Sequence, residues 1–205
     1  MSTERHNQSS NDHPPVPNDE NRTTVNQILK TILHGWNFDL FTGIDRPVTG
    51  SFYYKDTIYP CSISSRRPRL RRSNKHQWEI RIGPANCIMS AGPGSHLIDI
   101  PDLPKQYIPV AIDHLAVDPV KRGQGFGTLT AQTLEVLLTQ YAHITNTPVV
   151  VFCEDDSDTG WTQRIAHRYK ATSLSADWLD TSPIARLVNI NPGFYKIYQP
   201  KVHRR

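Results

Sequence analysis

The stretch Leu115–Leu129 reads LAVDPVKRGQGFGTL and places three glycines on alternate positions behind Arg122. A helix is predicted to begin there, and glycine destabilises a helix by about 1 kcal/mol relative to alanine. A helix N-terminus carries unpaired N–H groups and a partial positive charge, which together attract anions. Glycines remove the side chains that would keep a phosphate away from those amides. The stretch therefore predicts a phosphate-binding loop at a helix start.

The segments on both sides of this loop define the core of the fold. Ile108–Val117, IPVAIDHLAV, is a nearly continuous apolar run that predicts a central strand covered on both faces. Residues 128–144 carry leucines on one helical face, and residues 148–153, PVVVFC, predict a second buried strand. Strand, loop, helix and strand in this order indicate a βαβ-like unit.

The upstream half predicts one helix followed by antiparallel strands. Apolar residues at helical spacing predict a helix from Thr24 to Gly35, with Thr23 or Thr24 as its cap. Turn-forming residues then separate four β-like stretches, which suits an antiparallel meander. These stretches are Gly50–Tyr54, Thr57–Ile63, Gln77–Ile82 and Cys87–Ala91.

The chain has 205 residues, enough for one domain with a sizeable core. Residues 1–22 hold only Met1 and Val16 as apolar side chains larger than proline, so this tail is predicted to be disordered. Residues 23–205 then form a single domain with an atypical part at about 172–205. The tail has no apolar signal region and no stretch is long enough to span a membrane. A cytoplasmic location is expected, with a nuclear address or an uncleaved export signal as alternatives.

Cysteines and histidines give no indication of a metal site. Cys61, Cys87 and Cys153 form no C-x-x-C pair, and the nine histidines lack zinc-ligand spacing. We therefore expect reduced thiols and no bound metal.

Much of the net charge of +4 comes from one basic run about a third of the way along the chain. This run is either a solvated loop between strands or an attractor for something anionic, such as nucleic acid, an acidic protein face or a phosphorylated cofactor. It comprises Arg66, Arg67, Arg69, Arg71 and Arg72, followed by Lys75.

The spacing of the glycines excludes two well-known types of phosphate-binding loop. A Walker loop needs G-K-[ST], and the dinucleotide fingerprint needs G-x-G-x-x-G directly after a strand; neither pattern is present. Arg122, Gly125 and Gly127 instead form R-x-x-G-x-G. With its flanking strands, this stretch resembles the pyrophosphate-binding motif of the GNAT superfamily of acetyl-CoA-dependent N-acetyltransferases. The resemblance covers about Ile108–Cys153.

This resemblance implies an α+β fold of the GNAT type, with mixed α/β architecture. Its central, mixed and twisted sheet would have about six to seven strands flanked by helices, with the strand–pyrophosphate loop–helix unit at its centre. Downstream, the chain departs from the family pattern. The family usually places a Gly-Phe pair soon after a helix that ends near a tyrosine. Here Tyr169 has no such pair after it, and Gly193-Phe194 comes only later.

The resemblance also implies a binding mode for acetyl-CoA, which would lie between the two apolar strands. Backbone groups of Leu115, Ala116 and Val117 would bond the pantetheine arm, and the N–H near Val117 would polarise the thioester carbonyl. The pyrophosphate would be held by a set of residues from the loop and the first helical turn. This set is Arg122, Gly123, Gln124, Gly125, Phe126, Gly127 and Thr128.

A catalytic base is needed if the acceptor is a lysine-like amine, whose deprotonation at pH 7 costs roughly 4–5 kcal/mol. Alternation along a strand predicts that Asp113 and His114 cannot both face the acceptor. Family members often place a basic residue on the face that Asp113 would share with Leu115 and Val117, although a bulge would swap faces. Asp113 is the first candidate, acting directly or through water, and His114 the second. A structural salt bridge and a core histidine are the alternatives for these two residues.

Two further residue types, glutamate and tyrosine, complete the candidate chemistry. Glu154, after the second strand, is a third candidate base. Family members usually protonate the leaving thiolate with a tyrosine, so Tyr169 is the first candidate acid. Tyr195 and Tyr198 are its alternatives, and each tyrosine has a packing role as the competing interpretation.

The function predicted from these features is acetyl transfer from acetyl-CoA to an amine of a protein, an aminoacyl-nucleic acid or a small molecule. The basic run favours a macromolecular, anionic acceptor, and no membrane partner is expected. A CoA-binding regulatory module without turnover and a nucleic-acid binder on this scaffold are the alternatives. Oligomerisation is left open.

Overall fold

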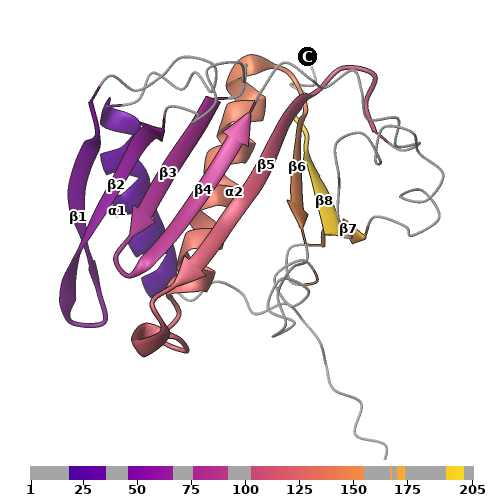
Figure 1. The fold of residues 1–205 in the computed structure, drawn as a ribbon. Coiled ribbons are helices and arrows are strands. Elements are labelled where there is room, and N and C mark those ends of the chain that lie inside the picture. Colours follow the sequence, from indigo (N-terminus) through magenta and orange to yellow (C-terminus); the bar gives the residue numbers. More distant parts are fainter. Residues whose placement is uncertain are drawn as a thin grey trace, which may run out of the picture.

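The computed structural model describes residues 19–35, 46–66, 76–91, 103–154, 167, 170–173 and 193–200. These residues form a mixed α/β fold, in which one sheet has the strand order β1-β2-β3-β4-β5-β6-β8-β7 (Figure 1). The sheet therefore has eight strands, against the six to seven expected. In chain order the elements are α1 (Asp19–Gly35), β1 (Val48–Tyr54), β2 (Thr57–Arg66), β3 (His76–Ile82), β4 (Ala85–Ala91), β5 (Ile108–Val117), η2 (Pro119–Lys121), α2 (Phe126–Thr145), β6 (Val149–Glu154), β7 (Thr172–Ser173) and β8 (Gly193–Tyr198).

Helix α1 begins earlier than the sequence pattern predicts. It starts at Asp19, so residues 19–22 of the predicted disordered tail are helical, while residues 1–18 lie outside the described chain. Asp19 and Glu20 give the first turn negative charge, which stabilises the positive end of the helix dipole. The predicted cap is accordingly wrong: the Thr23 hydroxyl lies inside the helix and donates to the Asp19 carbonyl at 3.0 Å.

Strands β1 to β4 form the predicted antiparallel meander. The turn between β1 and β2 consists of Lys55 and Asp56, whose φ angles are 47° and 59°. Positive φ at both positions is what a two-residue type I′ hairpin turn requires, and its twist matches that of the strands. β2 continues to Arg66, three residues beyond its predicted end, and β4 begins at Ala85 rather than Cys87. β7 and β8 have no counterpart among the predicted strands.

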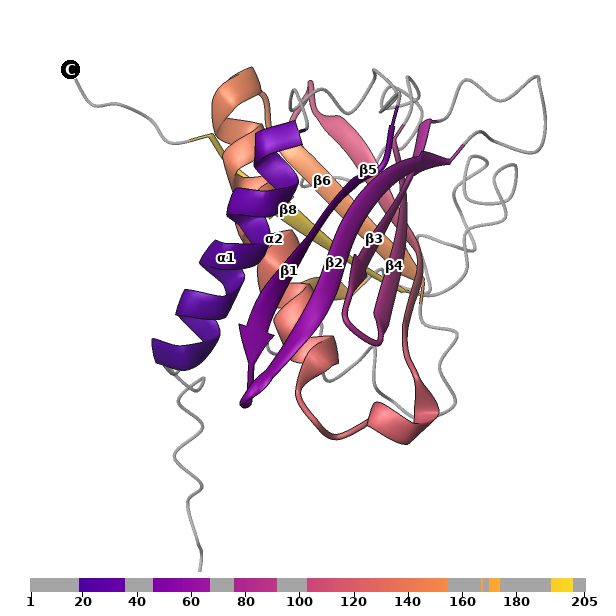
Figure 2. The same ribbon diagram turned by 90° about the vertical axis from the view of Figure 1, so that its left-hand side faces the viewer.

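The predicted βαβ unit is confirmed by β5, α2 and β6, because β5 and β6 pair in parallel. The expectation that β5 is covered on both faces is wrong. Only Val110 of this strand is buried, and Asp113 and His114 are exposed. The reason is that α1 and α2 lie on the same side of the sheet (Figure 2). No described helix covers the opposite side, which we call the helix-free face.

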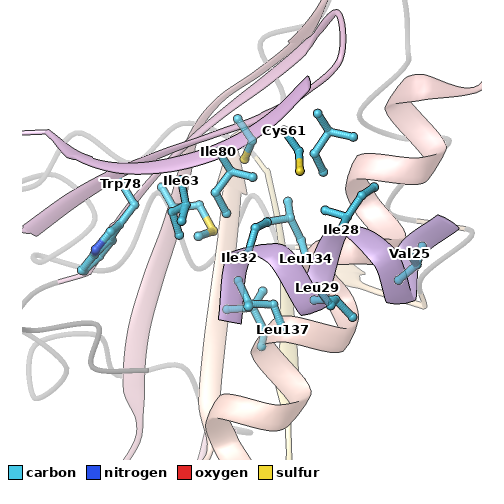
Figure 3. Close-up of a cluster of buried hydrophobic side chains, with 14 of the residues drawn as sticks. Val25, Ile28, Leu29, Ile32, Cys61, Ile63, Trp78, Ile80, Leu134 and Leu137 are labelled. Atoms are coloured by element: carbon cyan, nitrogen blue, oxygen red, sulfur yellow. The ribbon is translucent and has the colours of Figure 1, made fainter. Parts of the chain in front are cut away.

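The main core lies between the two helices and the sheet (Figure 3). Ile28 and Ile32 of α1 and Leu137 of α2 pack with the inward side chains of the strands, including Ile63 and Ile80. Each of these five side chains is at most 1% exposed. Because burying such a side chain contributes about 1.5–3 kcal/mol, this layer holds the helices against the sheet.

Candidate functional site

The segment after β5 leaves the sheet through a short, tightly bonded turn. The Asp118 side chain accepts a hydrogen bond from the Val120 N–H at 3.0 Å and thereby caps the 3₁₀ turn η2. The Asp118 N–H donates to the Pro84 carbonyl, at the β3–β4 turn, at 3.0 Å. Arg122 then donates through Nε to the Val117 carbonyl at 3.4 Å. These bonds fix the direction in which the glycine loop begins.

Two of the three glycines have backbone conformations that favour glycine. Gly123 has a φ of 77° and Gly125 a φ of 96°, both in the region that side chains rarely adopt. A Cβ atom on Gly125 would stand 2.5 Å from the Tyr54 hydroxyl, whereas one on Gly123 would meet nothing within 4 Å. Gly125 is therefore required by both conformation and space, and Gly123 by conformation alone.

The N-terminus of α2 presents backbone donors without a side-chain cap. Gly125 is the N-cap residue, and the first bond into the helix runs from the Leu129 N–H to the Gly125 carbonyl at 2.9 Å. No acceptor among the described residues pairs with the N–H groups of Phe126 or Gly127. These donors and the positive end of the helix dipole make the loop suitable for an anion.

The β1–β2 hairpin packs against this loop, a contact that the sequence analysis did not predict. Lys55 Nζ donates to the Gln124 carbonyl at 2.9 Å, and the Tyr54 hydroxyl donates to the same oxygen at 3.4 Å. The Tyr54 ring also meets Phe126 edge-on, with centroids 5.3 Å apart. Burial raises the pKa of Tyr54 above its usual value of about 10, so its hydroxyl stays a donor at neutral pH. The hairpin turn was predictable, but no pattern indicates a partner some 70 residues away.

The edge of β5 is open beside the loop. β5 pairs with β6 only from Ile108 to Ile112, where Ile112 stands opposite Cys153. The two strands then diverge, as Figure 1 shows below their paired ends. From Asp113 to Val117, no described strand pairs with β5 on that side, and the Val117 carbonyl accepts from Arg122 instead. This open segment includes the predicted Leu115, Ala116 and Val117, all of which are half-buried.

A β-bulge interrupts β5 opposite β4. Ile112 pairs with Met89 and His114 pairs with Ile88, so Asp113 is an additional residue on the β5 side. Ile112 and Leu115 both pack against the main core, although an unbroken strand would point them to opposite faces. The bulge therefore reverses the alternation of side chains along β5.

This reversal corrects the predicted orientation of the two candidate bases. Asp113 bonds to Ser90, whose partner on β5 is Ala111, so the Asp113 side chain lies on the helix-free face. The sequence analysis predicts that Asp113 shares a face with Leu115 and Val117. In the structure, Leu115 and Val117 face the core and Asp113 does not. His114 stands opposite Ile88 and belongs to the helix-free face as well. The prediction that these two side chains point to opposite faces is wrong, because the bulge places both on one side.

The Asp113 carboxylate is held by two polar side chains from neighbouring strands. Ser90 Oγ donates to Oδ1 at 3.0 Å, and Gln77 Nε2 donates to Oδ2 at 3.3 Å. On the same face, Glu79 accepts from both Nε and Nη2 of Arg81, at 2.9 and 2.8 Å. The face beside the open edge thus combines an oriented carboxylate with His114 and a separate ion pair. Sequence analysis missed Gln77 and Ser90, because their role depends on strand pairing.

The remaining candidates are placed only in part. Glu154 is the last residue of β6 and stands opposite Gly193 of β8. Tyr195 is buried with Tyr107 and Val150 in a second apolar cluster, and Tyr198 packs against the main core. Tyr169 and residues 67–72 of the basic run lie outside the described chain, and Arg66 ends β2. The structure therefore places Asp113 and His114 on β5, the strand that leads through η2 into the glycine loop, on the helix-free face of the sheet.

The described residues include neither a metal-binding cluster nor a helix that could span a membrane. No three histidine, cysteine, aspartate or glutamate side chains in the described ranges are grouped so as to hold a metal ion. None of the described helices has the length and apolar character needed to cross a membrane.

Comparison with known proteins gives a fold-level similarity only. No family model matches the chain, and no curated protein matches its sequence. Among solved structures, the chain is similar to the ribosomal-protein-S18-alanine N-acetyltransferase from Escherichia coli. The identity is 8%, the TM-score is 0.34, and the match covers 78% of this chain and 99% of the other.

Proposed function

We propose that this protein is an N-acetyltransferase that transfers the acetyl group of acetyl-CoA directly to an amine. The observation that carries the proposal is the placement of an uncapped helix start, with two left-handed glycines, at the end of a strand whose edge is open. The loop suits the pyrophosphate of CoA, and the open edge suits the amide-bearing pantetheine arm. A loop that served packing alone would not need both features side by side.

The cofactor-binding groups follow from this placement. Backbone N–H groups from Gly123 to Thr128 bind the pyrophosphate, with the Arg122 guanidinium at the rim. Leu115, Ala116 and Val117 pair with the pantetheine arm through their backbone, in the place that a neighbouring strand would otherwise take. The N–H near Val117 polarises the thioester carbonyl as the acceptor amine attacks.

Proton transfer is assigned to the helix-free face of the bulge. A lysine-like acceptor has a pKa of about 10.4 and must lose a proton before it attacks. Asp113 accepts that proton directly or through a water, and its contacts with Ser90 and Gln77 orient the carboxylate. Each carboxylate oxygen keeps a lone pair for the substrate, because each has one described donor. His114, on the same face, is the second candidate base.

The acceptor class and the acid are proposed from the sequence, because Tyr169 and residues 67–72 lie outside the described chain. Tyr169 is proposed to protonate the leaving thiolate. The run from Arg66 to Arg72 favours an amine on an anionic macromolecule, and small-molecule amines form the comparison set for an acceptor screen.

The first experiment measures acetyl-CoA binding by calorimetry in the wild type, Gly123→Glu and Gly123→Gln. Both variants add a side chain into open space at the same positive φ, so they carry the same backbone strain. Only Gly123→Glu adds a carboxylate to the phosphate site. We expect it to bind at least about tenfold more weakly than Gly123→Gln, a difference of about 1.4 kcal/mol. Equal binding by the two variants, or no binding by the wild type, contradicts a pyrophosphate at this loop.

If binding is established, release of free CoA thiol in the presence of amine acceptors tests turnover. Thiol release that depends on the amine supports the transferase. Tight binding without release for proteins, aminoacyl-nucleic acids and small amines favours the regulatory CoA-binding module.

A further inference from the structure

Lys55 occupies an unusual position at the tip of the β1–β2 hairpin. Its ammonium donates to the Gln124 carbonyl at 2.9 Å, between the two left-handed glycines of the loop. The ammonium also lies over the Tyr54 ring, 5.3 Å from the ring centroid, and with three N–H donors it can still donate to another partner. No carboxylate among the described residues forms an ion pair with it, and the neighbouring Asp56 instead accepts from the Tyr53 hydroxyl at 2.9 Å. Within the described chain, Lys55 therefore contacts a carbonyl and an aromatic ring but no carboxylate.

Several full or partial positive charges gather around the start of α2. Lys55 Nζ lies 4.0 Å from the point that a Cβ atom of Gly125 would occupy, beside the N-terminus of α2. The helix dipole puts partial positive charge there, and Arg122 lies on the same loop. Like charges gathered in this way repel one another unless an anion lies between them. A negatively charged ligand bound at this place would offset the repulsion between these charges.

The hairpin that carries Lys55 is held rigidly against the loop. Tyr54 is 4% exposed, and its ring meets that of Phe126, which is 1% exposed. Tyr59, on the other strand of the hairpin, meets Phe126 edge-on at 4.8 Å. Since both strands contact one buried ring, the turn that bears Lys55 cannot move away from the loop without opening the core. The position of the ammonium is therefore defined by tertiary packing.

We propose that Lys55 is a phosphate-selecting residue of the cofactor site, which acts through its charge on the diphosphate of the ligand. This inference rests on the proposed function, because it takes acetyl-CoA as the ligand of the loop. It adds that the β1–β2 hairpin forms the outer wall of the phosphate site. The wall favours thioesters that carry the diphosphate over those that end at the pantetheine arm.

The test compares two ligands, acetyl-CoA and the phosphate-free acetyl-pantetheine, by calorimetry. Lys55→Met removes the charge and the donor, whereas Lys55→Gln keeps a neutral donor for the Gln124 carbonyl. Lys30→Met is the matched control, because Lys30 is exposed on α1. We expect both Lys55 variants to bind acetyl-CoA about 3- to 10-fold more weakly, as for a charge-assisted contact at a partly exposed site. Binding of acetyl-pantetheine, and binding of both ligands by Lys30→Met, should stay unchanged.

Several results would overturn the inference while leaving the proposed function intact. Wild-type affinity for acetyl-CoA in Lys55→Met shows that the charge is not used. An equal loss of affinity for acetyl-CoA and acetyl-pantetheine shows a structural role of Lys55. Full affinity in Lys55→Gln shows that a neutral hydrogen-bond donor to the Gln124 carbonyl is enough. Absence of acetyl-CoA binding in the wild type overturns both the proposed function and the inference. Raising the salt concentration should also narrow the difference between wild type and Lys55→Met, because screening weakens exposed charges.

Discussion

Replacing Gly125 by alanine tests the contact between the hairpin and the loop directly. The new Cβ would stand 2.5 Å from the Tyr54 hydroxyl and 3.7 Å from the ring carbon that bears it. The first distance is a severe overlap, and the second is an ordinary contact. Tyr54 cannot easily turn aside, because its ring is buried and packed against Phe126. The overlap should therefore be relieved only by removing the hydroxyl.

The expected energies can be separated by a double-mutant cycle with Tyr54→Phe. The positive φ of Gly125 costs an alanine about 1–2 kcal/mol, and the overlap adds about 1–3 kcal/mol. Gly125→Ala should thus lower the free energy of unfolding by about 2–5 kcal/mol in the wild type. In the Tyr54→Phe background, only the backbone strain of about 1–2 kcal/mol should remain. The coupling energy between the two sites is then at least about 1 kcal/mol.

Urea denaturation of the four proteins gives these free energies, provided that the denaturant slopes agree. Tyr54→Phe alone should cost less than about 1 kcal/mol, since its hydrogen bond to Gln124 is long at 3.4 Å. A coupling energy below about 0.5 kcal/mol would refute the reasoning. It would mean that Gly125 and Tyr54 do not approach each other as closely as the structure places them.

Three further predictions follow from the site and the core. Asp113→Asn should lower kcat/KM for acetyl transfer about 100-fold or more, because it removes the proposed base. Ser90→Ala loses one hydrogen bond that orients the Asp113 carboxylate and should lower kcat/KM less. Steady-state kinetics with detection of the free thiol measures both variants, and full activity in Asp113→Asn contradicts the role of Asp113 as base. Leu137→Ala should lower the free energy of unfolding by about 2–5 kcal/mol, because the Leu137 side chain is 1% exposed. Urea denaturation measures this, and a decrease below about 1 kcal/mol would contradict the burial of Leu137. Burial raises the pKa of Cys87, so the folded state keeps a proton that the unfolded state loses above about pH 8.5. The free energy of unfolding should therefore fall as the pH rises above that value, and a Cys87→Ala variant measured from pH 7 to 10 should show a shallower fall.

Local patterns determined much of the fold. Apolar spacing identified α1, the four meander strands, β5, α2 and β6, because each buries one defined face, and burial imposes a period on the sequence. The predicted start of α1 was wrong, because the helix begins at Asp19 with a turn that charge stabilises and that has no apolar side chains. The positive φ of Gly123 and Gly125 agrees with the glycines that singled out this loop. Its role in binding acetyl-CoA remains a prediction.

Other features depend on pairs of residues that are distant in the chain. The bulge at Asp113 exists only in the register of β5 against β4, and it decides which side of the sheet holds Asp113 and His114. The contact of Lys55 with Gln124 and the pairing of β8 with β6 likewise join segments with no common pattern. A sequence records the faces that each segment must bury. Which segments meet, and in what register, is decided by packing the whole chain, because that choice depends on all contacts at once.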